Sequence, residues 1–292
     1  MSRIDEALRR AEVLSRPPTS QSSGDAFHSP WEGEQDAPVP PAAAGPVAQP
    51  AETLLTTVTG GALPSISARW GERLVSSPAC DATLLERFRH MAGTLQKAQT
   101  ATGLSQVLVT SATTGEGKTL TSINLALVLS ESYGRRVLLI DADLRRPSIG
   151  AMLDLPNLVG LSTALKSPVD QKLALVPLTP TLMLLPAGAP DPDPLSGLTS
   201  ARMRRILDEA AGRFDWVILD GPPTGPLAET SHLANMVQGT VFVLRAGETQ
   251  NASVQRSIEM LGRDRILGVV LNGVEGIEPE HYEAYYQKGP AQ

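Results

Sequence analysis

The stretch Ser111-Ala112-Thr113-Thr114-Gly115-Glu116-Gly117-Lys118-Thr119 lies between an apolar run and a long helical pattern, and it decides the fold. Its two glycines let backbone amides turn toward an anion, and the helix that follows adds its positive N-terminal end. Lys118 supplies a cation and Thr119 a hydroxyl for Mg²⁺. The stretch departs from the pattern G-x-x-x-x-G-K-[ST] only at Ala112. It therefore predicts a phosphate-binding loop.

The flanking segments favour this interpretation over a glycine-rich turn with an incidental lysine. The apolar run Gln106 to Thr110 predicts a strand before the loop, and Leu120 to Leu129 predicts a helix after it. The residues expected to contact a bound nucleotide are Thr114, Gly115, Glu116, Gly117, Lys118, Thr119 and Leu120.

Carboxylates follow two further apolar strands. Arg136 to Ile140 leads into Asp141 and Asp143, and the strand before Asp220 is equally apolar. Parallel sheets bind ligands in the crevice beyond the carboxyl ends of their strands. There, Asp141 and Asp143 could hold water around Mg²⁺ and accept a proton, while Asp220 orients the metal opposite the loop threonine. Surface acidic turns are the alternative interpretation.

Alternation of apolar strands and amphipathic helices predicts an α/β fold, with at least five parallel strands and helices on both faces. We expect four regions. They are an amphipathic helix at 1–16, a disordered Pro/Ala-rich linker at 17–64, the phosphate-binding domain at 65–280 and a tyrosine-containing tail at 281–292.

Composition excludes several classes of protein. The formal net charge is −6 and residues 17–64 contribute five of these negative charges, so no basic stripe indicates a nucleic-acid partner. Cys80 is the only cysteine, which excludes an internal disulfide or a thiolate cluster and favours a reducing, cytoplasmic compartment. No apolar run reaches the roughly 20 residues that span a bilayer, and no signal peptide is expected.

The two ends of the chain carry further signals. The apolar stripe of the N-terminal helix needs a surface, either on this domain or on a partner. Three of the four tyrosines, Tyr282, Tyr285 and Tyr286, lie in the last 11 residues, where accessible hydroxyls are more expected than core side chains. An aromatic docking patch is the alternative. Asn272, just after a predicted strand, could contact an adenine edge or form an Asn-Gly turn.

These motifs together resemble the bacterial tyrosine kinases of capsule and exopolysaccharide production, of the cytoplasmic CpsD/CapB-like type. Residues 111–119 resemble that family's Walker A motif, residues 138–147 its Walker A′ and residues 218–223 its Walker B. Residues 1–10 are also similar to the start of autokinases encoded in some exopolysaccharide export loci. The resemblance covers residues 80–288.

Two departures from related patterns carry information. Family members often use a Glu-x-x-Arg-x-x-Arg motif for ring assembly, and here Glu86 and Arg89 are followed by Ala92. Partition and division-site ATPases use hydrolysis to control partner binding. They resemble one another in having a lysine at the loop position that Thr113 occupies here. That difference favours the kinase over the ATPase switch.

The resemblance implies an ATP- and Mg²⁺-dependent tyrosine autokinase. Lys118, Asp141, Asp143 and Asp220 would be catalytic, Thr119, Asp141 and Asp220 would hold the metal, and the three tail tyrosines would accept phosphate in trans. It also implies a homo-oligomer, with a ring as one arrangement, and a separate activator similar to polysaccharide co-polymerases. That activator would hold the kinase peripherally at the inner membrane, and a cognate tyrosine phosphatase would reverse the modification.

Overall fold

The computed structural model describes residues 53–57, 72–156, 159–225 and 228–274. The chain divides into two compact units, residues 1–50 and 51–292, and the first lies wholly outside the described residues. The predicted helix at 1–16 and the tail at 281–292 also lie outside them. None of the described helices is long and apolar enough to cross a membrane.

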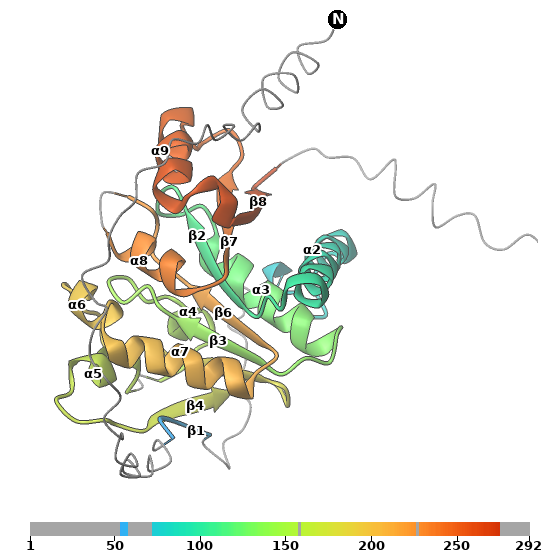
Figure 1. Cartoon of the computed structure of the whole chain (residues 1–292). Coiled ribbons are helices and arrows are strands. Elements are labelled where there is room, and N and C mark those ends of the chain that lie inside the picture. Colours follow the sequence, from blue (N-terminus) through green and yellow to red (C-terminus); the bar gives the residue numbers. More distant parts are fainter. Residues whose placement is uncertain (1–52, 58–71, 157–158, 226–227, 275–292) are drawn as a thin grey trace, which may run out of the picture. The chain divides into compact units, whose positions relative to one another are not determined.

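The second unit is built on one eight-stranded sheet (Figure 1). Its strands are β1 (Leu55–Thr57), β2 (Gln106–Ser111), β3 (Val137–Asp141), β4 (Leu173–Pro177), β5 (Leu182–Leu185), β6 (Trp216–Asp220), β7 (Gly239–Arg245) and β8 (Ile266–Asn272). Their order in space is β1-β4-β5-β3-β6-β2-β7-β8. Every neighbouring pair is parallel except β4 and β5. The prediction of a mostly parallel sheet is confirmed.

Helices connect the strands and cover the sheet. The described helices are α2 (Ala82–Thr102), α3 (Lys118–Glu131), α4 (Ile149–Met152), α5 (Leu161–Lys166), α6 (Leu195–Leu198), α7 (Ala201–Arg213), α8 (Glu229–Met236) and α9 (Asn251–Leu261), with a 3₁₀ turn at Arg263–Arg265. Asp81 caps α2 by accepting from the amide of Thr83, and Gly103 ends it with a φ of 74°. Asp and Gly are residue types typical of these two helix ends.

The central strands bury side chains on both of their faces. In β3, Leu138 and Ile140 join the core under α7, whereas Leu139 points to the other face and joins the core under α2 and α3. All three side chains are fully buried. Successive strand residues alternate between faces, so a strand covered on both sides must be apolar throughout. This requirement explains the continuous apolar runs that predicted the sheet.

The predicted linker boundary at residue 64 is wrong, because β1 lies inside that segment. Leu55 pairs with Leu173 in β4. Glu209 on α7 accepts hydrogen bonds from the amides of Leu54 at 2.7 Å and Leu55 at 3.1 Å. Neither β1 nor β4 was predicted. A strand of three residues has no readable periodicity, and its partners are more than 100 residues away in sequence.

We predict that Glu209→Ala loosens β1 from the domain. Two backbone amides would lose their acceptor, which should lower the free energy of unfolding by about 1–3 kcal/mol. Urea denaturation measures this difference. Glu259→Ala, on an exposed position of α9, is the matched control and should leave the midpoint unchanged. Equal midpoints for both variants would contradict this role of Glu209.

Candidate active site

The loop between β2 and α3 has the geometry of an anion cradle. Gly115 and Gly117 adopt φ values of 86° and 93°, in the left-handed region that favours glycine. The loop borders a cavity of about 350 Å³. Residues from four other parts of the described chain complete its lining: Arg73, Asp143, Arg146, Ser148, Met152, Arg245 and Asn272. Lys118, Thr119 and Leu120 in the first turn of α3 also line the cavity, and the first turn of a helix has amides free to bind an anion.

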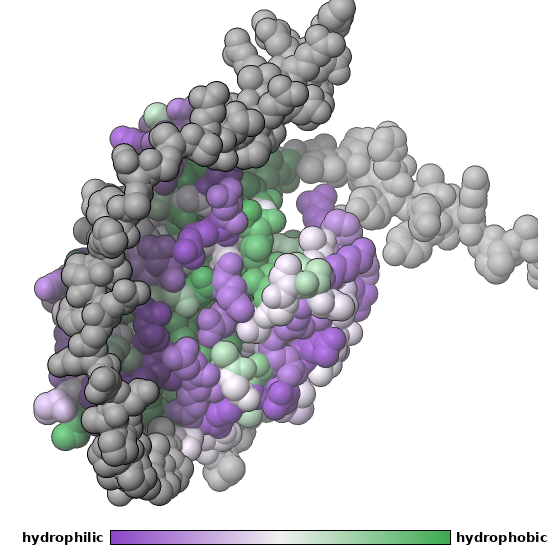
Figure 2. Space-filling model, in the orientation of Figure 1, coloured by the Kyte–Doolittle hydropathy of each residue, from purple (hydrophilic) through white to green (hydrophobic). Residues whose placement is uncertain are grey.

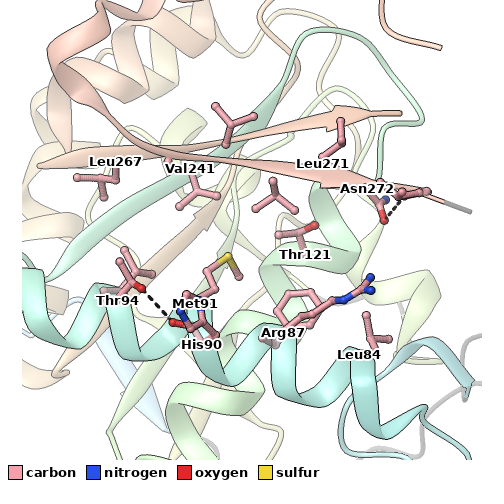
Figure 3. Close-up of a pocket in the computed structure, with 17 residues that line it drawn as sticks. Leu84, Arg87, His90, Met91, Thr94, Thr121, Val241, Leu267, Leu271 and Asn272 are labelled. Carbon is pink, nitrogen blue, oxygen red and sulfur yellow. Dashed lines mark hydrogen bonds between the residues drawn. The ribbon is translucent and has the colours of Figure 1, made fainter. Parts of the chain in front are cut away.

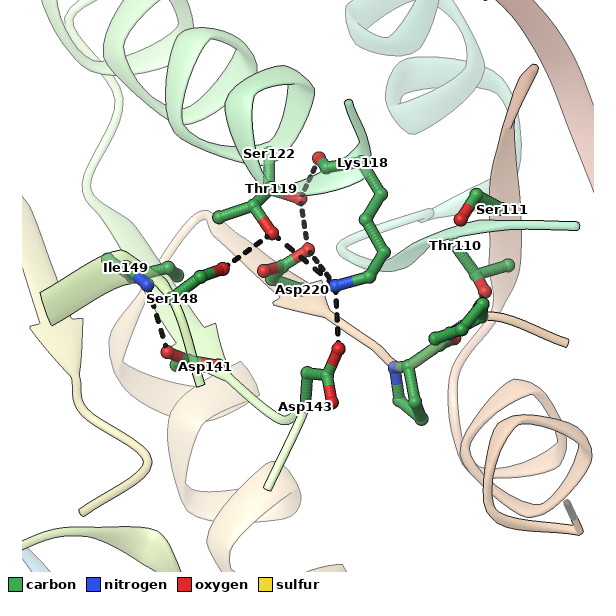
Figure 4. Close-up of polar contacts among 12 residues, drawn as sticks. Thr110, Ser111, Lys118, Thr119, Ser122, Asp141, Asp143, Ser148, Ile149 and Asp220 are labelled. Atoms are coloured by element: carbon green, nitrogen blue, oxygen red, sulfur yellow. Dashed lines mark hydrogen bonds and ion pairs between the residues drawn. The ribbon is translucent and has the colours of Figure 1, made fainter. Parts of the chain in front are cut away.

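Lys118 brings the ends of two strands together at this loop (Figure 4). Its Nζ lies 2.8 Å from Oδ2 of Asp143 and 3.8 Å from Oδ1 of Asp220. All three side chains are buried. Burial by itself lowers the pKa of Lys118, but Asp220 and Asp143 outweigh it and raise that pKa above its usual value. The lysine is therefore held as a cation.

Asp141 and Asp220 are neighbours at the ends of β3 and β6. Asp141 is 1 % exposed and Asp220 is fully buried, and burial raises the pKa of both carboxyls, that of Asp141 strongly. Asp220 also raises the pKa of Asp141, whereas Lys118 opposes both shifts. One oxygen of each, Oδ1 of Asp141 and Oδ2 of Asp220, has no hydrogen-bond partner among the described residues.

Three hydroxyl groups lie close to these two carboxylates. Thr119 Oγ1 lies 3.0 Å from Ser148 Oγ, and Ser122 donates to Oδ1 of Asp220 at 3.1 Å. The sequence prediction included Thr119 but missed both serines. Ser122 follows Lys118 by one helical turn, a spacing that could have revealed it. Ser148 lies in the turn after the acidic strand end, where sequence periodicity gives no signal.

The side chain of Glu116 braces the phosphate loop, which leaves its backbone amide as the group expected to contact a nucleotide. Its side chain is 2 % exposed, does not line the cavity and accepts from the amide of Thr113 at 2.8 Å and from the hydroxyl of Thr249. Asn272 donates to the Glu116 carbonyl at 2.9 Å. These contacts tie the loop to the ends of β7 and β8. A Cβ on Gly117 would lie 2.0 Å from Nδ2 of Asn272, so this contact needs glycine.

The predicted metal donors fit a magnesium ion. Mg²⁺ prefers oxygen ligands and keeps several waters, so it needs few protein groups. Asp141 and Asp220 each provide a buried oxygen without a hydrogen-bond partner, and Thr119 provides a hydroxyl nearby. Within the described part of the chain no cluster of three or more His, Cys, Asp or Glu side chains could hold a metal. The oxygen donors of Asp141, Asp220 and Thr119 suit a hard, partly hydrated cation.

The fold and this site together define a P-loop NTPase. Residues 104–289 match the ParA family model, described as the NUBPL iron-transfer P-loop NTPase. The tyrosine-protein kinase YwqD of Bacillus subtilis is 33 % identical over 207 residues, which cover 70 % of this chain and 86 % of YwqD. The chain belongs to the bacterial tyrosine-protein kinases within this class.

Two further relatives agree with this assignment. The kinase domain of the Escherichia coli tyrosine kinase ETK superposes with a TM-score of 0.60 at 30 % identity, covering 65 % of this chain and 76 % of ETK. The succinoglycan biosynthesis transport protein ExoP of Rhizobium meliloti is 28 % identical over 209 residues, which cover 70 % of this chain but 26 % of ExoP. The kinase relatives favour the autokinase over the partition-type switch.

The iron transfer in the family description has no counterpart in this sequence. The chain has one cysteine, and Cys80 lies before the matched residues 104–289. A cluster site needs several thiolates. The family model therefore describes the fold of this chain, and the kinase relatives describe its activity.

We predict that Asp141→Asn stabilises the protein in the absence of nucleotide and Mg²⁺. Asparagine keeps an acceptor for the amide of Ile149, which donates to Oδ2 of Asp141 at 3.2 Å, and removes a buried charge. The melting temperature should rise by about 2–4 °C for each kcal/mol gained. Asp264→Asn, on an exposed turn, is the control and should not change it. A lower melting temperature for Asp141→Asn would contradict this account.

Proposed function

We propose that this kinase transfers the γ-phosphoryl group of ATP to Tyr282, Tyr285 and Tyr286 of another copy of the same chain. The observation that carries the proposal is the buried group of Lys118, Asp143 and Asp220 beside a glycine loop. Phosphoryl transfer requires mostly positioning and neutralisation of charge, and this group provides both.

The loop would hold the phosphates of the nucleotide. Backbone amides from Thr114 to Leu120 would surround the phosphate oxygens. Lys118 would give up an ion pair with a carboxylate and bind the β- and γ-phosphates instead. Asn272 lines the same cavity and donates to the Glu116 carbonyl. Its side chain would also contact the adenine ring. Thr119, Asp141 and Asp220 would hold Mg²⁺, which neutralises phosphate charge when bound.

The proton of the acceptor tyrosine needs a base, because the ordinary pKa of its phenol is about 10. Asp143 and Asp141 are the carboxylates at the end of β3 that could accept it. In the step, the phenolic oxygen forms a bond to the γ-phosphorus, the bond to the ADP oxygen breaks and the proton passes to the carboxylate. ADP and a phosphotyrosine are the products.

Phosphorylation would weaken self-association through the tail. Each phosphate adds about −1.5 to −2 charges, which disfavours docking of the tail near acidic side chains. A ring built through Glu86 and Arg89 would lack its third member. Ala92 stands at that position with 0 % exposure, inside the contact of α2 with the core, so an arginine there would be buried. A ring of this chain would therefore use Glu86 and Arg89 without the second arginine of the motif.

The cellular role we propose is control of capsule or exopolysaccharide polymerisation and export. ExoP, a polysaccharide transport protein, contains a segment similar to this chain, which supports such a role. The activator would be a separate co-polymerase-like protein of the inner membrane that holds the cytoplasmic kinase at that surface. A cognate tyrosine phosphatase would remove the phosphates. Full activity of the purified chain at high dilution would argue against a required activator.

Mixing two inactive variants tests transfer in trans. Lys118→Ala keeps the tyrosines but should lose phosphoryl transfer, whereas Tyr282→Phe/Tyr285→Phe/Tyr286→Phe keeps the site but lacks acceptors. Neither variant should label itself at the tail with labelled ATP and Mg²⁺ in the presence of the activator. The mixture should label the tail of Lys118→Ala, as peptide mapping by mass spectrometry would show.

Two outcomes would contradict the proposal. Label confined to residues outside the tail would exclude these acceptors. Release of phosphate to water at the wild-type rate, with no tyrosine labelled in the presence of the activator, would favour the partition-type ATPase switch instead. The Tyr133→Phe variant is a matched control, since Tyr133 lies outside the tail and its hydroxyl bonds to the Arg89 carbonyl.

A further inference from the structure

A groove of about 480 Å³ lies between helix α2 and strand β8 (Figure 3). Its floor is apolar, because Leu84 and Met91 of α2 and Val270 of β8 all pack against the core cluster that contains Phe88. Gly268, on the same face of β8 as Val270, contributes no side chain and borders open space. Figure 2 shows apolar surface in green between the two elements. Such a surface commonly marks an interaction site.

The rim of the groove is basic. Arg87 and His90 occupy exposed positions of α2 and line the groove, and none of the described residues that line it is acidic. The neighbouring Arg89 pairs with Glu86, whereas no carboxylate of the described residues lies within ion-pair distance of Arg87. An occupant that is apolar in part and negatively charged would therefore complement this groove.

The chain supplies such a segment directly after β8. Val274, the last described residue, itself lines the groove. The nine residues that follow, 275–283, include four glutamates and no lysine or arginine, together with the apolar Ile277. The segment 275–292 is thus attached at the groove and opposite to it in charge.

The length of this segment suffices to cover the groove. In Figure 3, Asn272 and Leu84 lie at one end of the groove and Leu267 and Thr94 at the other. The strand from Leu267 to Asn272 spans about 17 Å, at about 3.4 Å for each residue. The 18 residues after Val274 reach about 60 Å when extended. Gly273, with a φ of 70°, already bends the chain at the point where it must reverse.

We infer that residues 275–292 bind in the groove between α2 and β8 of their own copy. The glutamates pair with Arg87, and Ile277 packs on the apolar floor. The segment then runs back along β8, from the Asn272 end toward the Leu267 end. Because it is tethered at Val274, its effective concentration at the groove is in the millimolar range, about that of a short flexible linker.

Other occupants complement the groove less well. The amphipathic segment 1–16 carries four arginines against three acidic residues, so it offers Arg87 no net negative charge. The groove of a second copy carries the same Arg87 and would repel it. Among these three, the segment 275–292 alone has both the charge and the attachment.

The docking has a consequence for phosphoryl transfer, and this consequence rests on the proposed function. Asn272 lines both the groove and the cavity beside the phosphate loop, so the two sites adjoin at that end. A segment that runs toward Leu267 carries its tyrosines away from the cavity of its own copy. Transfer to another copy's tail would require that tail to leave its groove. Docking therefore lowers the share of chains whose tyrosines can accept phosphate.

A distance between two spin labels on the full-length chain tests the docking. In a Cys80→Ser background, Lys97→Cys and Gln287→Cys provide the only two thiols. Lys97 is exposed on α2 and does not line the groove. Pulsed electron paramagnetic resonance should give one narrow peak of distances for a docked segment and a broad distribution for a free one. No ATP is added, so the result is independent of whether the tyrosines accept phosphate.

Variants of Arg87 test the charge pairing. Arg87→Glu should abolish the narrow peak, because the glutamates would then face a carboxylate. Arg204→Glu makes the same change at an exposed position of α7 and, as the matched control, should keep the peak. Arg87→Lys should keep it as well. Adding Glu278→Arg and Glu280→Arg to Arg87→Glu should restore the peak, which a misfolded groove could not do.

Three outcomes would overturn the inference. A broad distribution in the chain that carries only the labels would show that the segment does not dock. A peak that persists in Arg87→Glu would place the segment away from this groove. A peak that disappears when labelled chains are diluted with excess unlabelled wild type would come from the segment of another copy. A failed mixing experiment for phosphoryl transfer would leave the peak unchanged, so the two failures are distinguishable.

Discussion

The pairing of the Lys118 ammonium with carboxylates from two other strands is the interaction on which the active site depends. Lys118 begins α3, Asp143 follows β3 and Asp220 ends β6. The ammonium lies within 4 Å of both carboxylates. Charges this deeply buried are stable only when paired. The sheet order, in which β3, β6 and β2 are neighbours, is what brings the three groups to one place.

The same site carries a cost in stability. Asp141 and Asp220 are buried side by side, and each has an oxygen without a hydrogen-bond partner among the described residues. Burial raises the pKa of both, so the folded state disfavours their ionised forms. A hard divalent cation would compensate both charges at once. Functional sites commonly retain such locally unfavourable groups, because the chemistry requires them.

Much of the fold could be predicted from local sequence. Apolar runs predicted the central strands because both faces of β3 and β6 are buried, and α2 begins and ends at residue types typical of helix caps, Asp81 and Gly103. Sequence reasoning failed where a segment takes its structure from distant partners. β1 is three residues long and depends on Glu209 and Leu173, and Ser148 enters the site only through the turn after β3. The tyrosine tail lies outside the described residues and stays a prediction.

The sequence by itself determined the phosphate loop, the acidic strand ends and the alternation of strands with helices. These features depend on residues a few positions apart, through turn geometry, capping and periodicity. Only the tertiary structure decided that Glu116 braces the loop instead of lining the cavity, which carboxylate oxygens lack hydrogen-bond partners, and that β8 is an edge. Those properties depend on the order of strands and on burial, which packing over the whole sheet decides.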